Sequence, residues 1–230
     1  MEILFMYFNY FKFLFVLLCG AATACSVVES SSKRNAPAPT PKPAFVATVS
    51  TPKGEQTAVF AGGCFWGLEA VFEHVKGVSN VTSGYSGGEA KTANYDAVGD
   101  GDTGHAEAVK ITFDSSKVSY EQLLKVFFAV AHDPTELNRQ GPDTGTQYRS
   151  AIFYANDEQK RIAQSFIEKL TADKVFAKPI VTQIVALENY YQAEDYHQDY
   201  LVQHPNQPYI VINDKPKVEN LRKQFPDLYQ

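Results

Sequence analysis

Residues 57–67 read Thr-Ala-Val-Phe-Ala-Gly-Gly-Cys-Phe-Trp-Gly, an apolar run followed by two glycines and a cysteine. The run Thr57–Ala61 predicts a short buried strand that ends at Gly62-Gly63. Apolar residues then recur at helical spacing from Cys64 to Val75, which predicts a helix. The glycines allow a sharp turn between the two elements, so we expect Cys64 in the first turn of that helix.

Strands and helices continue to alternate downstream of this turn. Further strands are predicted at Ala106–Phe113, Ser150–Tyr154 and Val181–Leu187. Further helices are predicted from Ser119 to Ala131, with Gln122 completing a capping box, from Asn156 to about Ala172, and over 193–203 and 218–225. Because the stretches between these elements are long and irregular, the pattern indicates an α+β domain, a two-layer sandwich with a mixed sheet and flanking helices.

The composition is typical of a soluble globular protein. Hydrophobic residues make up 44% of the 230 residues and charged residues 20%. The formal net charge of −5 argues against nucleic acid as a partner, because binding phosphates requires a basic surface. The sequence contains no Cys-x-x-Cys and no His-Glu-x-x-His, so we expect neither a dithiol redox pair nor a metal site.

Residues 1–24 have the layout of an export signal. Their charged residues are Glu2 and Lys12, and the apolar run Phe13–Leu18 and a series of small residues follow. The run is short for a membrane-spanning helix. Because Met1–Phe11 is also apolar, an uncleaved N-terminal anchor is the alternative.

Two processing schemes meet at Cys25. Ala22-Thr23-Ala24 is a small-x-small site for a signal peptidase. The same residues resemble a bacterial lipobox, with Ala22 in place of the usual Leu, which would make Cys25 an acylated N-terminus. Residues 25–53 are rich in Ser and Pro and are expected to be a disordered linker, either a plain tail or a lipoprotein tether. The folded domain would then cover 54–230 in the bacterial cell envelope, with the membrane a partner only through this anchor.

Cys64 is the single cysteine of the predicted domain. At the start of a helix, exposed N–H groups and the helix dipole stabilise a thiolate, so we expect a lowered pKa and a reactive sulfur. A buried, inert cysteine is the ordinary alternative. Exported proteins tend to pair their cysteines, so an unpaired thiol beside two glycines favours a catalytic role.

The sequence Gly-Cys-Phe-Trp-Gly at 63–67 resembles the signature of the A-type peptide methionine sulfoxide reductases. Other segments resemble that family in the same order, over about residues 56–212: Gly84–Gly88, Asn94–Val98, Gly104–Val109, His132–Thr135, Asp143–Ser150 and Ala193–Gln198. The resemblance implies reduction of methionine-S-sulfoxide, free or in oxidised proteins, and therefore repair of oxidative damage in exported proteins.

The resemblance also implies a role for each matching residue. Cys64 would attack the sulfoxide sulfur as a thiolate and become a sulfenic acid. Glu107 would protonate the leaving oxygen, which requires a carboxyl group that burial keeps neutral near pH 7. Tyr95 and Tyr148 would donate hydrogen bonds to that oxygen, and Asp143 would orient the water or tyrosine network beside it.

Phe65 and Trp66 would form an apolar cage for the S-methyl group of the substrate. A sulfoxide is polar at its oxygen and apolar at its methyl group, so donors on one wall and aromatic rings on the other would fix its stereochemistry. Each of these residues alone would be an ordinary core or surface residue. Their order and spacing around Cys64 favour the catalytic interpretation.

Many members of the family have further cysteines near the C-terminus that reduce the sulfenic acid, whereas residues 65–230 contain none. We therefore expect no bound cofactor and an external thiol reductant such as thioredoxin or a small thiol. Cys25 is the alternative resolving thiol, provided that it is not acylated and that the linker folds back.

Two other functions stay open from the sequence alone. A Cys–His hydrolase requires a histidine beside the thiol, and His105 or His197 could take that place, although structural hydrogen bonding is the expected role of both. A non-enzymatic envelope lipoprotein would keep its function without Cys64.

Overall fold

The structure, a computed structural model, describes residues 54–230. The predicted export signal (1–24), the Ser- and Pro-rich linker (25–53) and Cys25 lie outside the described residues. Between residues 54 and 230, no helix combines the length and the apolar character that crossing a membrane requires.

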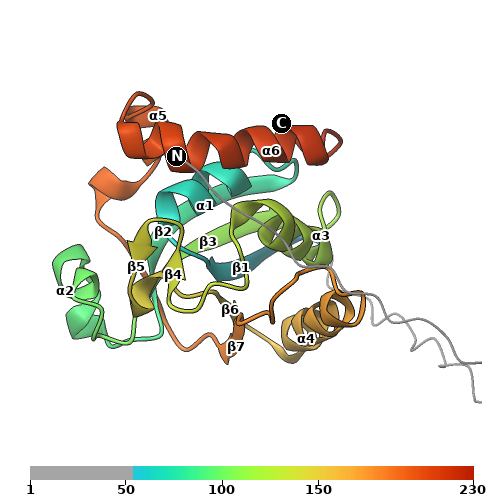
Figure 1. The fold of residues 1–230 in the computed structure, drawn as a ribbon, viewed down its shortest axis with the longest axis horizontal. Coiled ribbons are helices and arrows are strands. Elements are labelled where there is room, and N and C mark those ends of the chain that lie inside the picture. Colours follow the sequence, from blue (N-terminus) through green and yellow to red (C-terminus); the bar gives the residue numbers. More distant parts are fainter. Residues whose placement is uncertain (1–53) are drawn as a thin grey trace, which may run out of the picture. The chain divides into compact units, whose positions relative to one another are not determined.

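A six-stranded sheet forms the centre of the domain (Figure 1). The sequence predicts a mixed sheet and four of its strands, β1, β3, β6 and β7. The strand order is β7–β6–β1–β3–β2–β8, and each neighbouring pair is antiparallel except β6 with β7. The strands are β1 (Glu55–Ala61), β2 (Val78–Ser86), β3 (Ala106–Asp114), β6 (Ala151–Tyr154), β7 (Gln183–Ala186) and β8 (Tyr190–Gln192). A separate ribbon pairs β4 (Arg139–Gln140) with β5 (Asp143–Thr144).

Helices flank this sheet. The α-helices are α1 (Phe65–Glu73), α2 (Tyr95–Gly99), α3 (Tyr120–Val126), α4 (Asp157–Ala172), α5 (Tyr200–Gln203) and α6 (Lys215–Gln224). The 3₁₀ segments are η1 (Ala90–Thr92), η3 (Thr146–Tyr148) and η4 (Asp195–His197), and the π-helical segments are η2 (Phe127–Ala131) and η5 (Ile210–Asp214). Helix α1 packs on β2, β3 and α6, whereas α4 packs on β6, β7 and α3 (Figure 1).

The two faces of the sheet bury apolar clusters of different size. On β1, Phe60 belongs to the main core with α1 and α3, whereas Val59 belongs to a small cluster on the other face. Side chains alternate along a strand, so Glu107 of β3 shares the face of Val109 and Ile111, which belong to the main core. The fold thereby carries a carboxyl group into an apolar interior.

The turn between β1 and α1 requires glycine at position 63. Gly63 has a φ of +91°, and a Cβ atom there would lie 2.5 Å from Cγ of Gln140. Cys64 follows as the N-cap residue of α1, one position before the first turn in which the sequence places it. The close approach of the Gln140 side chain fixes the path of the chain into Cys64.

Local sequence signals predict two helix starts correctly. Ser119 caps α3 through a capping box with Gln122, and the Asn156 side chain accepts the N–H of Gln159 at the start of α4. Beyond Val126, the predicted helix widens into the π-helical segment η2. Each cap is formed by residues close in sequence, so tertiary packing does not alter the helix start.

The helix predicted over 193–203 is wrong. The chain forms the short segments η4 and α5 instead, and between them Asp199 adopts a left-handed conformation with a φ of +51°. The Gln198 side chain pairs with the backbone of Ser83 on β2, accepting its N–H at 2.9 Å and donating to its carbonyl at 3.1 Å. This anchoring to the sheet overrides the local helical pattern.

Candidate active site

Cys64 and Glu107 form the floor of the site at the N-terminal end of α1. They are buried, with 7% and 3% of their surfaces exposed. Oε2 of Glu107 accepts the N–H of Phe65 at 3.0 Å, which ties β3 to the first residue of the helix. Burial, followed by the charge of Glu107, raises the pKa of the Cys64 thiol, so the two groups lie within electrostatic reach of each other.

Burial raises the pKa of Glu107 to about 8. The hydrogen bond from the Phe65 N–H acts in the opposite direction, and the charge of Asp143 adds a smaller upward effect. Glu107 is therefore mainly protonated near pH 7, as a carboxyl group that acts as a general acid must be.

The expectation of a lowered pKa at Cys64 is wrong for this structure. Burial raises the pKa of the thiol well above its usual value, and the charges of Glu107 and Asp214 add to the effect. The backbone N–H of Trp66 and the ammonium group of Lys217 lower the pKa, but by less. The helix N-terminus does stabilise the thiolate, as the sequence indicates, but the low polarity around the buried sulfur outweighs it.

Tyr95 and Tyr148 approach this floor from two separate segments, α2 and η3. The charges of Glu107 and Cys64 act on the pKa of both tyrosines, which places both near the same point. Burial is the main cause that raises the pKa of Tyr95 to about 12 and that of Tyr148 beyond its usual range. Within residues 54–230, neither hydroxyl has a hydrogen-bond partner, so both are available as donors.

Tyr95 is held in place through its backbone. Oε1 of Glu194 accepts the Tyr95 N–H at 2.9 Å, and Oε2 of the same carboxylate accepts the hydroxyl of Tyr85 at 2.9 Å. The Asn94 side chain caps α2 by accepting the N–H of Ala97. These contacts fix the start of α2 relative to β2.

Asp143, on β5, accepts a hydrogen bond from the hydroxyl of Tyr209. Burial, followed by the charge of Cys64, raises the pKa of Tyr209, so this tyrosine also faces the nucleophile. Tyr209 is a site residue that the sequence does not indicate. The sequence indicates its partner Asp143 and a water or tyrosine network beside it, but not which tyrosine takes part.

The aromatic wall consists mainly of Trp66 and Tyr200. Their rings stack with centroids 3.7 Å apart and planes 6° apart, and Nε1 of Trp66 donates to Nδ1 of His197 at 3.2 Å. Trp66 is half-buried, whereas Phe65 has no exposed surface and packs on Tyr85 and His197. Phe65 therefore lies behind the wall, and Trp66 forms its face.

The two candidate histidines are structural hydrogen-bonders, as expected. His197 binds the indole of Trp66, and Nε2 of His105 pairs with the carbonyl of Glu89 at 3.1 Å. Among residues 54–230, no hydrogen bond joins either imidazole to Cys64, which argues against a Cys–His pair. Among residues 54–230, no cluster of three His, Cys, Asp or Glu side chains is arranged to hold a metal ion.

Comparisons with known proteins agree with this geometry. The family model of peptide methionine sulfoxide reductase matches residues 56–229. Peptide methionine sulfoxide reductase MsrA 2 of Mesorhizobium japonicum is 60% identical over 176 residues, which is 76% of this chain and 90% of the relative. The protein of the same name from Synechocystis is 51% identical over 178 residues, covering 77% and 83% of the two chains.

Solved structures show the same fold. Mxr1 from Saccharomyces cerevisiae in its reduced form superposes with a TM-score of 0.62 at 33% identity, covering 67% of this chain and 88% of that one. Methionine sulfoxide reductase A of Corynebacterium diphtheriae superposes with a TM-score of 0.59 at 35% identity, covering 69% and 78%. The chain belongs to the peptide methionine sulfoxide reductase family, whose members are oxidoreductases that act on a sulfur group.

Proposed function

We propose that this enzyme reduces methionine-S-sulfoxide by attack of Cys64 on the sulfoxide sulfur, with Glu107 as the acid. The observation that supports this most strongly is the pairing of a buried thiol with a buried carboxyl group whose pKa burial raises to about 8. Both groups hold their protons near pH 7. A sulfoxide oxygen needs two protons to leave as water, and these two groups carry them.

The proposed first step balances in atoms and electrons. A bond forms between Sγ of Cys64 and the sulfoxide sulfur while the S–O bond breaks. The thiol proton and the Glu107 proton leave with the oxygen as water. That water then attacks Sγ, methionine departs as the thioether, and Glu107 takes back one proton. The Cys64 thiol is oxidised to a sulfenic acid, and the substrate sulfur is reduced by the same two electrons.

The walls of the site suit the two sides of a sulfoxide. The free hydroxyls of Tyr95 and Tyr148 would hold the oxygen, and Asp143 would hold Tyr209 beside them. The face of Trp66, locked by its stack on Tyr200, would accept the S-methyl group. A sulfoxide of the opposite configuration would place its methyl group against the hydroxyls, so we propose selectivity for the S epimer.

An external thiol completes the proposed cycle. Cys64 is the sole cysteine among residues 54–230. A first thiol would condense with the sulfenic acid, releasing water and leaving a mixed disulfide, and a second thiol would attack that disulfide and free Cys64. A thioredoxin-like dithiol protein supplies both thiols in one molecule, and a small thiol supplies them one at a time. Oxidised proteins of the cell envelope are the proposed substrates.

We propose export to the cell envelope. Residues 1–24 would be removed by cleavage before Cys25, either alone or together with acylation of Cys25. The support is the sequence pattern of residues 1–43, and the family match begins only at residue 56. Cell fractionation and mass spectrometry of the mature N-terminus decide this. A cytoplasmic protein with residues 1–24 intact would contradict the proposal.

The activity test compares wild type with Cys64→Ser. With dithiothreitol as reductant, we expect wild type to reduce free and peptide-bound methionine-S-sulfoxide and to leave the R epimer untouched. We expect Cys64→Ser to show no turnover. An inactive wild type would defeat the proposal. A Cys25–Cys64 disulfide after one equivalent of sulfoxide would contradict the dependence on an external thiol.

A further inference from the structure

The large hydrophobic residues that the domain exposes are unevenly distributed. Between residues 54 and 230 they include Val175 and Val185, which lie away from the site, and a larger group that we term the apolar rim. The apolar rim consists of Leu137, Tyr196, Val202, Val211 and Ile212, which are 64%, 57%, 64%, 45% and 70% exposed. Single exposed apolar residues are ordinary, but a group gathered in one region marks a binding surface.

Two members of the apolar rim lie on the segments that carry the aromatic wall and its neighbours. Val202 lies on α5, two residues after Tyr200, whose ring stacks on Trp66. Tyr196 immediately precedes His197, which packs against Tyr95 with ring centroids 4.4 Å apart. The charge of Tyr196 also acts on the pKa of Tyr95, so this exposed ring lies close to one of the candidate donors.

The remaining members adjoin the polar side of the site. Val211 and Ile212 lie on η5, directly after Tyr209, which binds Asp143. Leu137 lies in the loop that leads into β4, three residues before Gln140, whose side chain covers Gly63 next to the nucleophile. Both α5 and η5 pack on α1, the helix whose N-cap residue is Cys64.

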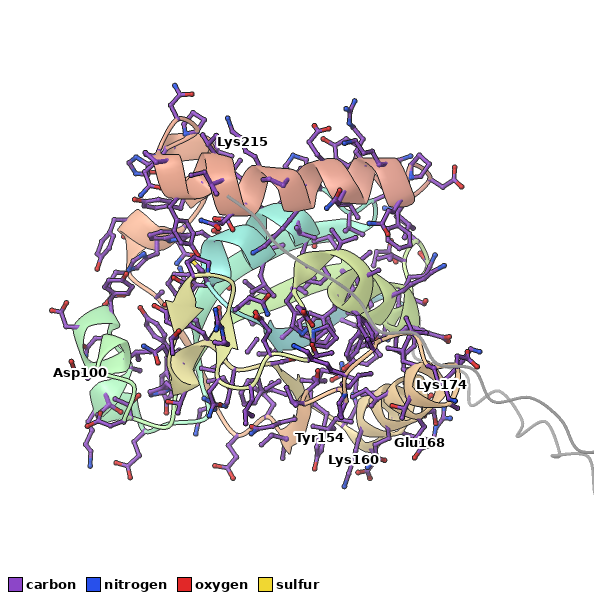
Figure 2. The ribbon with its side chains drawn as sticks, in the orientation of Figure 1. Asp100, Tyr154, Lys160, Glu168, Lys174 and Lys215 are labelled. Atoms are coloured by element: carbon purple, nitrogen blue, oxygen red, sulfur yellow. The ribbon has the colours of Figure 1, made fainter. Side chains whose placement is uncertain are left out.

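The other exposed apolar residues lie elsewhere on the domain. Lys174, next to Val175, lies near the end of α4, far across the view from Lys215, which directly follows η5 (Figure 2). Val185 lies on β7, an edge strand of the sheet. In Figure 1 this strand lies at the opposite side of the sheet from helices α1 and α6, which pack on each other. Val175 is 56% exposed, within the range of the apolar rim, and Val185 is 40% exposed, just below it, so both resemble the apolar rim in residue type but not in place.

We propose that the apolar rim docks the apolar residues that flank a methionine sulfoxide in an oxidised polypeptide. Methionine lies mainly in protein cores. Its oxidation places a polar group there, disrupts the packing and exposes the apolar neighbours. Such a segment brings apolar side chains together with the sulfoxide, and the apolar residues on the segments that carry the site would bury them. This inference rests on the proposed function.

The test uses three substrates with dithiothreitol as reductant. These are N-acetyl-methionine-S-sulfoxide, a peptide with Leu, Val and Ile around the methionine-S-sulfoxide, and a peptide of equal length with Ser, Thr and Asn there. We expect wild type to prefer the apolar peptide over the polar one by about 10-fold in kcat/KM.

The variants are Val202→Ser and Ile212→Ser, singly and together, with Val175→Ser and Val185→Ser as matched controls. Each rim variant is expected to lower kcat/KM for the apolar peptide about 3- to 10-fold and to leave N-acetyl-methionine-S-sulfoxide unchanged. The controls are expected to change neither. Circular dichroism verifies that each variant is folded.

The outcomes separate this inference from the proposed function. Equal effects of the rim and control variants, or no preference for the apolar peptide in wild type, would overturn the docking proposal while leaving reduction of the small substrate intact. Rim variants that change only the KM for a thioredoxin-like reductant would also overturn it, since the surface would then serve the reductant. A wild type inactive on N-acetyl-methionine-S-sulfoxide would defeat the proposed function itself.

Discussion

Replacing Glu107 with Gln removes the acidic proton of the carboxyl group and changes the shape of the side chain little. Gln has nearly the same shape, and its side-chain oxygen can accept the Phe65 N–H that Glu107 accepts at 3.0 Å. The variant cannot supply a proton to the leaving oxygen. General acid catalysis contributes about 100- to 10,000-fold, so kcat/KM for methionine-S-sulfoxide is expected to fall by about that factor at pH 7.

The same substitution has a stability effect that requires no substrate. Burial raises the pKa of Glu107 from an ordinary 4.5 to about 8. The folded protein therefore keeps a proton that the unfolded chain loses above about pH 4.5. The stabilisation is fully present below that pH and is lost as the pH rises through about 8. Across the interval of about 3.5 pH units, at about 1.4 kcal/mol for each, the loss amounts to about 5 kcal/mol.

The assay is urea unfolding of wild type and Glu107→Gln at a series of pH values from 5 to 9. The unfolding free energy of wild type minus that of the variant is expected to fall by roughly 1.4 kcal/mol per pH unit up to about pH 8 and to level off above it. Glu69 and Glu73, whose pKa values burial also raises, are present in both proteins and cancel. Glu168→Gln on the surface of α4 is the control and should show no such slope (Figure 2).

The pH dependence of activity follows from the same proton. As Glu107 ionises through about pH 8, kcat/KM of wild type is expected to fall, and this decline should be absent from the residual activity of Glu107→Gln. A free-energy difference independent of pH would refute the buried, protonated carboxyl group. Full activity in Glu107→Gln would refute its role as the acid.

Other variants probe the walls of the site and its packing. Tyr95→Phe and Tyr148→Phe each remove a hydroxyl donor and are expected to lower kcat about 10-fold, with a larger loss in the double variant, in steady-state assays with dithiothreitol. Tyr209→Phe removes the hydrogen bond to Asp143 and is expected to lower kcat/KM about 3- to 10-fold in the same assay. Gly67→Ala would place a Cβ atom 2.2 Å from a buried carboxylate oxygen and is expected to lower the unfolding free energy by about 1–3 kcal/mol in urea. Unchanged kinetics in the tyrosine variants, or unchanged stability in Gly67→Ala, would contradict these assignments.

Much of the fold was predictable because its signals are local. The apolar run before Gly62, the cap at Ser119 and the cap at Asn156 depend on neighbouring residues, and the structure has the elements that they predict. Strand β2 was not predicted. Its buried end includes Ser83, Gly84 and Ser86, which are polar or small, so the strand lacks an apolar two-residue period.

The site was predictable in its residue types but not in its electrostatics. The sequence indicates an exposed helix start at Cys64, which favours a thiolate. The structure buries that start, and a segment distant in sequence, η5, packs on α1 and brings the charge of Asp214 to the thiol. Tyr200 and Tyr209 were missed for the same reason, since their contacts with Trp66 and Asp143 form only when the chain after Asp199 folds back over α1.

Mass spectrometry of the enzyme after one equivalent of methionine-S-sulfoxide, without reductant, is the most direct test of attack by Cys64. This attack predicts one equivalent of methionine and one oxygen atom added at Cys64, trapped as a sulfenic acid by a dimedone-type reagent, with neither product from Cys64→Ser. Methionine formed without modification of Cys64, or formed equally by Cys64→Ser, would contradict it.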